Sequence, residues 1–216
     1  MSTPLSDKLI ARLKNINHLE GWCTTDKAEH MAQIILDRRP HLIVEIGVFG
    51  GRSAIAMGMA CQEAGCGEVI GIDPWTKAAA VEGGTSPESD EWWSKLDYEK
   101  IYSGALGATR ALGVDDVVRF ERTHDTVMLG EFLDGTIDLL HLDSNHSELV
   151  SVRSVRDWTP KMRPGGILLV DDSHWASQAR AVELLKTELG YRHLDTKEFL
   201  NAEGQIAMQY MVFEKL

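Results

Sequence analysis

The sequence predicts an α/β protein in which a doubly wound sheet carries helices on both faces. Three observations support this prediction. Short apolar runs alternate with longer amphipathic stretches along the chain. The runs are continuously apolar, which is typical of strands that are buried on both faces. Several runs end in glycines or acidic residues, and open α/β sheets bind ligands beyond the carboxyl ends of their strands.

Length and composition indicate one ordinary globular domain. The chain has 216 residues, of which 44% are hydrophobic and 25% are charged, enough for a substantial core. The formal net charge of −11 excludes nucleic acid and anionic membranes as main partners, because both need a basic face. Three cysteines without C-x-x-C spacing indicate neither a disulfide framework nor a zinc site. No signal-peptide core or membrane-length apolar stretch is present, so we expect a cytoplasmic protein.

The first half of the chain is predicted to alternate helices and strands. Residues 5–16 have the pattern of an amphipathic helix. Thr25 or Asp26 can cap the next helix, whose apolar positions share one face, and Pro40 ends it. The elements expected after it are strands at residues 42–46, 67–73 and 117–121 and helices at residues 54–63 and 91–112.

The second half continues the same alternation. Two apolar strands end at Asp143 and Asp172. A helix and the turn RPGG separate them, and the turn residues favour a break in the chain. The elements expected here are helices at residues 147–158 and 176–189, the turn at residues 163–166, and final strands at residues 191–196 and 206–213.

A glycine turn joins the first strand to its helix in the run EIGVFGGRS, residues 45–53. Glycine lets the backbone turn tightly and lets a ligand approach the main chain. The dinucleotide pattern G-x-G-x-x-G fails, because Phe49 stands where its second glycine would be. The next strand ends in Asp73, at a spacing suited to a carboxylate that accepts both hydroxyls of a ribose. Each feature alone fits a tight turn or a solvated acid, but together they indicate a nucleoside site.

The segments VEIGVFGG and VIGIDPW resemble, in order and spacing, the first motifs of class I S-adenosylmethionine-dependent methyltransferases. The resemblance covers about residues 25–213. It implies a Rossmann-like, mostly parallel, seven-stranded sheet with an antiparallel last strand. It also implies a set of cofactor contacts: Glu45, Gly47 and Gly51 at the methionine and ribose, Ser53 at the methionine carboxylate, Asp73 at the ribose, Thr123, His124 and Asp125 at the adenine, and Asp143 as a further contact.

Acidic residues follow two neighbouring strands of the expected sheet. Asp143 ends one strand, and Asp171 and Asp172 end the next, so we expect the carboxylates to converge at one edge. Three carboxylates repel one another unless they are protonated or bridged by a cation. Oxygen ligands suit a hard ion, Mg²⁺ first and another divalent cation such as Mn²⁺ next. The alternative is that one or two of these acids cap the helices that follow.

His146 is the predicted general base. Metal-dependent O-methyltransferases of the catechol type carry an Asp after strand four, a lysine base three residues later, and Asp-Asn after strand five. This chain resembles them with Asp143, His146 and Asp171-Asp172, so that His replaces Lys and Asp replaces Asn. An imidazole accepts protons near neutral pH. The alternative is that His146 only begins a helix.

The opening H-x-D-x-x-H-S and the later RPGGILLVDD resemble the methyltransferase 24 type more closely. Metal-dependent sugar O-methyltransferases, which act on macrolide sugars and actinobacterial mannosides, belong to that wider group. The resemblance implies a single methyltransferase domain over residues 25–216, preceded by an N-terminal helical segment at residues 1–24. A long excursion near residues 74–104 is predicted as a lid insertion, because long loops in compact domains tend to be functional.

Six aromatic side chains are expected near the substrate. The tryptophans could stack on a sugar ring or simply pack within the lid, and the histidines follow or precede the predicted metal acids. The six residues are Trp75, Trp92, Trp93, His141, His174 and Trp175.

The residues and the resemblance together predict an O-methyltransferase that depends on S-adenosylmethionine and a divalent metal. Its acceptor is a hydroxyl of a small molecule, with a saccharide as the leading choice and a phenol or catechol as the alternative. A nonenzymatic module that binds the cofactor is the alternative from another class. His146 with three acids argues against that module, because a pure binder needs no base. The sequence leaves the acceptor and the formation of a homo-oligomer open.

Overall fold

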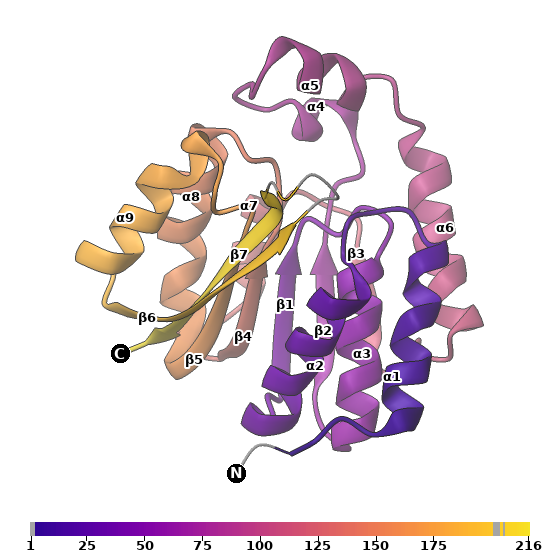
Figure 1. The fold of residues 1–216 in the computed structure, drawn as a ribbon. Coiled ribbons are helices and arrows are strands. Elements are labelled where there is room, and N and C mark those ends of the chain that lie inside the picture. Colours follow the sequence, from indigo (N-terminus) through magenta and orange to yellow (C-terminus); the bar gives the residue numbers. More distant parts are fainter. Residues whose placement is uncertain (1–2, 201–203, 205) are drawn as a thin grey trace. The chain divides into compact units, whose positions relative to one another are not determined.

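The computed structural model describes residues 3–200, 204 and 206–216. Seven strands form one mixed sheet in the order β3-β2-β1-β4-β5-β7-β6, and Figure 1 shows them with their helices. The chain divides into two compact units, Met1–Trp75 with Asp97–Thr123 and Thr76–Leu96 with His124–Leu216. The first unit contains β1 to β3, and the second contains β4 to β7.

Three parallel strands form the sheet of the first unit. Val44 of β1 pairs with Ile70 of β2, and Ile70 pairs with Arg119 of β3. Gly58 lets a helix approach β3 closely, because a Cβ at this position would lie 2.3 Å from Val118 Cγ2. The elements are α1 (Asp7–Leu13), η1 (Lys14–His18), α2 (Thr25–Arg38), β1 (Leu42–Ile46), α3 (Arg52–Ala64), β2 (Glu68–Ile72), α6 (Tyr98–Ala111) and β3 (Val118–Glu121).

The second unit contains one parallel and two antiparallel strand pairs. Strand β4 runs parallel to β5, while β7 runs antiparallel to both β5 and β6. Its elements are α4 (Lys77–Ala80), α5 (Pro87–Trp93), α7 (Asp125–Met128), η2 (Leu129–Glu131), β4 (Ile137–Leu142), α8 (Glu148–Trp158), η3 (Thr159–Lys161), β5 (Met162–Asp171), η4 (Ala176–Gln178), α9 (Ala179–Thr187), β6 (Tyr191–Leu200) and β7 (Ile206–Lys215).

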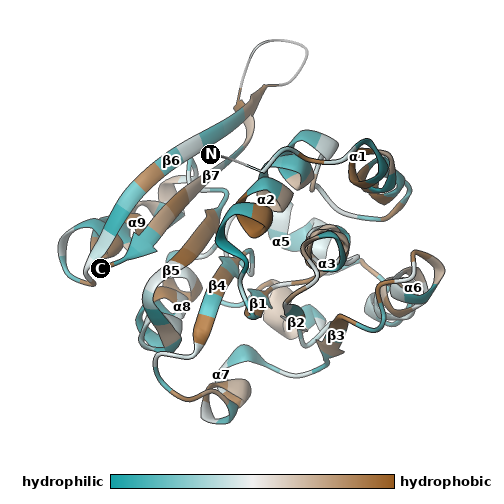
Figure 2. Cartoon of the chain, turned by 90° about the horizontal axis from the view of Figure 1, so that it is seen from below, coloured by the Kyte–Doolittle hydropathy of each residue, from teal (hydrophilic) through white to brown (hydrophobic). Residues whose placement is uncertain are grey.

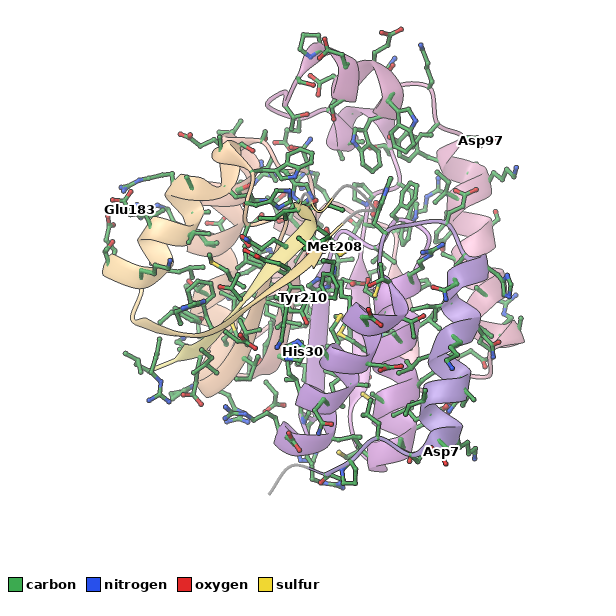
Figure 3. The ribbon with its side chains drawn as sticks, viewed as in Figure 1. Asp7, His30, Asp97, Glu183, Met208 and Tyr210 are labelled. Atoms are coloured by element: carbon green, nitrogen blue, oxygen red, sulfur yellow. The ribbon has the colours of Figure 1, made fainter. Side chains whose placement is uncertain are left out.

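The buried core of each unit contains the apolar runs from which the strands were predicted. Figure 2 shows β5 coloured hydrophobic over much of its length, and Leu168 and Leu169 of β5 are fully buried. Met208 and Tyr210, labelled in Figure 3, lie on β7. Tyr210 is fully buried, and the ring of Phe199 on β6 stacks on it with centroids 6.1 Å apart. Within the described part of the chain, no helix is both long enough and apolar enough to cross a membrane.

The predicted fold class is confirmed, including the antiparallel last strand. Some element boundaries differ from the expectation. Thr24, rather than Thr25 or Asp26, caps α2 by accepting the backbone N–H of Lys27. The expected turn at residues 163–166 lies inside β5, because the β4–β5 register shifts between Ile137 and Leu139 and so accommodates the extra residues.

The segment predicted as a lid insertion contains α4, α5 and the beginning of α6. The helix expected over residues 91–112 is interrupted, since α5 ends at Trp93 and Asp97 caps α6. The short helices α4 and α7 were not expected, because four residues are too few for a clear periodicity. The proposed boundaries of the N-terminal segment and of the insertion remain predictions.

Candidate functional site

One carboxylate organises the loop that follows β1. Asp73 comes directly after β2, and its Oδ2 accepts the backbone N–H groups of Val48 and Phe49, each at 3.0 Å. Its Oδ1 accepts the backbone N–H of Trp75 at 2.7 Å. A carboxylate offers about four lone-pair positions, and these bonds use three of them. The geometry therefore leaves room for one ligand hydroxyl on Oδ1, where the sequence suggested two ribose hydroxyls.

The same loop contains backbone strain. Phe49 and Trp75 have φ angles of 50° and 46°, in the left-handed region, where a bulky residue costs about 1–3 kcal/mol and tends to mark a functional site. The indole Nε1–H of Trp75 donates to the carbonyl oxygen of Phe49 at 2.9 Å. Trp75 is buried between Tyr102 and Phe120, with ring centroids 4.7 and 5.9 Å away. The indole thus packs within the first unit, and the substrate contact of Trp75 stays a prediction.

Burial makes the charge of Asp73 unfavourable. It raises the pKa of this carboxyl, and the negative charge of Glu45 adds to the increase, while the three N–H bonds lower the pKa but do not compensate. Burial, together with the charge of Asp73, also raises the pKa of Tyr98 to about 12. Perturbed ionisable groups of this kind cluster at functional sites. Asp73 would therefore gain from a ligand that donates a hydrogen bond.

The other residues predicted at the methionine and ribose lie along the same loop. Gly47 and Gly51 have φ angles of 88° and 84°, which favour glycine. Glu45 is fully buried in β1, and Ser53 is buried in the first turn of α3. Their roles as cofactor contacts stay predictions, but the structure brings all four to the β1–α3 turn.

An N-terminal segment covers this loop, which the sequence did not indicate. The indole of Trp22 stacks on the ring of Phe49 with centroids 5.3 Å apart and an interplanar angle of 29°. A Cβ on Gly50 would lie 2.2 Å from the carbonyl oxygen of Glu20, so only glycine permits this approach. Trp22 belongs to no motif, and nothing in the sequence pairs it with residues 49–50.

The predicted adenine contacts follow β3. Thr123 ends the first unit, and in the second unit His124 caps α7, which begins at Asp125. Asp125 is buried and accepts the indole Nε1–H of Trp158 at 3.0 Å, while His124 Nε2 lies 3.3 Å from Glu82 Oε2. Both side chains have protein partners here, and their adenine contacts stay predictions.

A cluster of possible metal ligands lies at the ends of β4 and β5. Ligand atoms of His141, Asp143 and Asp171 all lie within 4.8 Å of one another. His141 lies on β4 and Asp143 follows its last residue, so the strand alternation places the two side chains on the same side. The pairing of Leu142 with Val170 brings Asp171 beside them. One imidazole nitrogen and two carboxylates suit a divalent cation, and the imidazole extends the choice beyond Mg²⁺ to Mn²⁺ and other transition metals.

This cluster overlaps with the predicted metal ligands and differs from them in one residue. Asp143 and Asp171 belong to it, and His141 stands where Asp172 was expected. Asp172 has a φ angle of 46°, and its Oδ2 lies 3.0 Å from Nε2 of His146. The alternation along β4 already placed His141 on the side of Asp143, but the sequence gave no reason to rank an imidazole above a third carboxylate.

His146 has a polar neighbour at each ring nitrogen. Its Nε2 faces Asp172 and also lies 3.7 Å from Asp143 Oδ1. Its Nδ1 lies 2.8 Å from the amide Nε2 of Gln178, a buried residue that the sequence did not single out. The ring of Trp175 packs edge-on against the imidazole at 5.3 Å, yet 36% of Trp175 is exposed. His146 is thus oriented by its neighbours and lies beside acidic side chains.

The insertion is fastened to the segment that contains His146. The amide of Asn145 donates to the carbonyl oxygen of Ala80 at 2.6 Å. Arg153 of α8 binds both carboxylate oxygens of Glu82, which lowers the pKa of Glu82 and raises that of Arg153. A Cβ on Gly83 would lie 2.6 Å from the hydroxyl of Ser147. These contacts all belong to the first half of the insertion.

The remaining predicted substrate residues lie on the surface of the second unit or near it. Trp92 and Trp93 contact each other edge-on at 4.9 Å in α5, and Trp92 is exposed. His174 lies beside Trp175, with ring centroids 6.4 Å apart. Their contact with a substrate stays a prediction.

Comparison with known proteins agrees with this geometry. A family model described as a methyltransferase domain, of the methyltransferase 24 type, matches residues 44–173. No curated protein matches the sequence.

Several solved structures share the fold at low identity. A cofactor-bound protein from MTB has a TM-score of 0.68 at 15% identity, covering 97% of this chain and 90% of that one. The O-methyltransferase TomG from Streptomyces achromogenes, involved in tomaymycin synthesis and solved with SAM, has a TM-score of 0.66 at 15% identity, covering 98% and 92%. An O-methyltransferase from Bacillus cereus in complex with SAH has a TM-score of 0.65 at 15% identity, also covering 98% and 92%.

Proposed function

Because the chain belongs to the methyltransferase domain family of the 24 type, we propose that it is an O-methyltransferase that uses S-adenosylmethionine and a divalent cation. Its acceptor is a hydroxyl of a small molecule, with a saccharide as the leading choice. The observation that carries this proposal is the cluster of His141, Asp143 and Asp171 with His146 beside it. The structures solved with SAM and with SAH support the choice of cofactor, because they share the fold.

The cofactor would lie against the β1–α3 turn. The left-handed glycines let a ligand approach the main chain there, and Asp73 would accept one ribose hydroxyl through Oδ1. The carboxylate is already rigid, because three backbone N–H groups hold it. A rigid acceptor loses little conformational freedom when a ligand binds.

The cation would be held by His141, Asp143 and Asp171. When bound, it lowers the pKa of a hydroxyl at the site, as metals do for water. With one imidazole among the ligands, we expect Mn²⁺ to bind at least as tightly as Mg²⁺.

His146 would take the proton from the acceptor hydroxyl. Its Nε2 faces the acidic side chains, so an acceptor held near Asp143 would present its hydroxyl to this nitrogen. Bound S-adenosylmethionine would supply the methyl group to the acceptor oxygen and would be left as S-adenosylhomocysteine. His146 would hold the acceptor proton until solvent removes it. Positioning and proton removal together account for the protein's part in the reaction.

Two candidate acceptors can be separated by experiment. Release of S-adenosylhomocysteine would be followed with methyl α-mannopyranoside and with catechol as probe acceptors, in the presence of EDTA, Mg²⁺ or Mn²⁺. We expect turnover only with a divalent cation, and we expect Asp171→Ala to lose both turnover and the tight binding of Mn²⁺ seen by electron paramagnetic resonance. Turnover that survives exhaustive chelation would refute the metal, and turnover of catechol alone would move the acceptor to the phenolic class.

A nonenzymatic module that binds the cofactor makes a different prediction. It would bind S-adenosylmethionine by calorimetry and transfer no methyl group to either acceptor class with any cation. His146 between Asp172 and a buried amide favours the enzyme, because a module that only binds has no use for an oriented imidazole.

A further inference from the structure

In the part of the chain that the structure describes, the Gln178 amide lies within hydrogen-bond distance of Nδ1 of His146. Gln178 is 4% exposed, it ends η4, and its amide nitrogen lies 2.8 Å from Nδ1. The opposite ring nitrogen, Nε2, lies 3.0 Å from Asp172 Oδ2. The imidazole is therefore held from both sides within one unit of the structure.

These two contacts determine which nitrogen carries the proton of the neutral ring. When the Gln178 amide N–H donates to Nδ1, that nitrogen must accept, so the proton is on Nε2 and points at Asp172. In this arrangement, Nε2 has no lone pair for an acceptor hydroxyl. When the amide is rotated by half a turn, its oxygen accepts from Nδ1–H, and the lone pair of Nε2 becomes available. Asn and Gln amides differ in these two orientations only by which atom faces the partner.

The groups around Gln178 can form hydrogen bonds with its amide in both orientations. Gln178 and His146 line a small cavity of about 10 Å³ together with Ser151 and Ser154 of α8, which is room for about one water molecule. Both serines are buried, and neither hydroxyl has a hydrogen-bond partner among the described residues. A hydroxyl donates or accepts by rotating about its C–O bond. A water bound between these hydroxyls could therefore serve either atom of a Gln178 amide that turns towards it.

We propose that Gln178 is the positioning residue that sets the tautomer of His146: its amide donates to Nδ1 in the resting protein and accepts from Nδ1–H when Nε2 is to take a proton. Only the role of this tautomer in catalysis rests on the proposed function. The tautomer itself is a property of the protein alone. Neighbours of this kind orient histidines by hydrogen bonding to the nitrogen that does not react.

The experiment measures the tautomer directly, by two-bond ¹H–¹⁵N correlation spectra of the histidine rings in metal-free protein, at a pH where the ring is neutral. His146→Asn assigns the signals. We expect the Nε2–H form in the wild type and the Nδ1–H form in Gln178→Glu, because a carboxylate only accepts. Gln209→Glu is the matched control, since Gln209 is also buried but bonds to Ser173 and Glu198. It should leave the His146 signals unchanged.

A second variant covers the case in which Gln178→Glu fails to fold. Asp172→Ala removes the acceptor of Nε2–H but leaves the Gln178 amide at Nδ1, so the ring should keep the Nε2–H form. An Nδ1–H form in the wild type or in Asp172→Ala, or an unchanged Nε2–H form in folded Gln178→Glu, would overturn the proposal. If the tautomer changes as expected but His146→Ala still transfers methyl groups at the wild-type rate, the role of His146 as base fails and the assignment of Gln178 stands.

Discussion

Replacement of Asp73 tests whether one carboxylate holds the loop after β1. Asp73→Ala leaves the N–H groups of Val48, Phe49 and Trp75 without the acceptor that now lies 2.7–3.0 Å from them. Each buried donor left unsatisfied costs about 1–3 kcal/mol, and water reaches part of this half-buried site. We therefore expect a loss of about 3–5 kcal/mol in the free energy of unfolding. For a chain of this size, each kcal/mol lowers Tm by about 2–4 °C.

The assay is urea unfolding of Asp73→Ala beside Asp97→Ala. Asp97 also accepts one backbone N–H, from Lys100 at 3.1 Å, as the exposed cap of α6, so its removal should cost only about 1 kcal/mol. S-adenosylhomocysteine should bind the Asp73 variant at least tenfold more weakly by calorimetry. An Asp73→Ala protein no less stable than Asp97→Ala would refute the structural role, and unchanged cofactor affinity would refute the ribose contact.

The pH dependence of stability gives an independent check on Asp73. Its pKa is raised in the folded protein, so protonation favours the fold, and this contribution is present below the unfolded pKa and lost as the pH rises through the folded pKa. The stability of the wild type relative to Asp73→Asn should therefore increase as the pH falls through the acidic range. A difference that decreases instead would show that hydrogen bonds to the charged form outweigh burial.

Three further predictions use other parts of the chain. His146→Ala should lower kcat by about a hundred- to ten-thousandfold with unchanged S-adenosylhomocysteine affinity, and a rate near wild type would contradict its role as base. Glu82→Gln should lower the free energy of unfolding by about 1 kcal/mol at pH 7. Arg153 lowers the pKa of Glu82, and protonation of Glu82 removes this stabilisation. The difference between wild type and variant in urea unfolding should therefore shrink as the pH falls. Gly50→Ala should lower Tm strongly, since its Cβ would meet a backbone oxygen at 2.2 Å. Gly107→Ala, where the added Cβ would have nothing within 4 Å, should be neutral or stabilising. Equal effects of the two variants in thermal melts would refute the steric argument.

The sequence predicted the fold because its signals are local. Continuous apolar runs identify buried strands, and their order along the chain limits the sheet topology. The prediction of a turn at RPGG was wrong for a physical reason. Strand β5 includes these residues in a bulge, and the register of this bulge depends on the partner strand β4. The turn propensity of these four residues carries no information about their pairing with a different strand.

The candidate site was predicted where strand ends bring residues together. The convergence of Asp143 and Asp171 followed from parallel pairing, and the structure places them in one cluster. Gln178 and Trp22 were missed because their contacts depend on side chains distant in the sequence, His146 and Phe49. A buried glutamine in a short 3-10 turn carries no pattern, so only the folded arrangement identifies it.

The bonds made by the first half of the insertion determine where it can be exchanged. Its first half is bonded to Asn145 and Arg153, and Asn145 is the neighbour of His146 in the chain. A chimera that replaces residues 77–83 would remove the partners of both side chains and disturb the segment that carries the imidazole. A chimera that begins after Gly84, where two consecutive glycines have φ angles of 75° and 67°, keeps these bonds and replaces only α5 and its tryptophans. Gly83-Gly84 is therefore the natural junction at which α5 can be exchanged without the loss of these bonds.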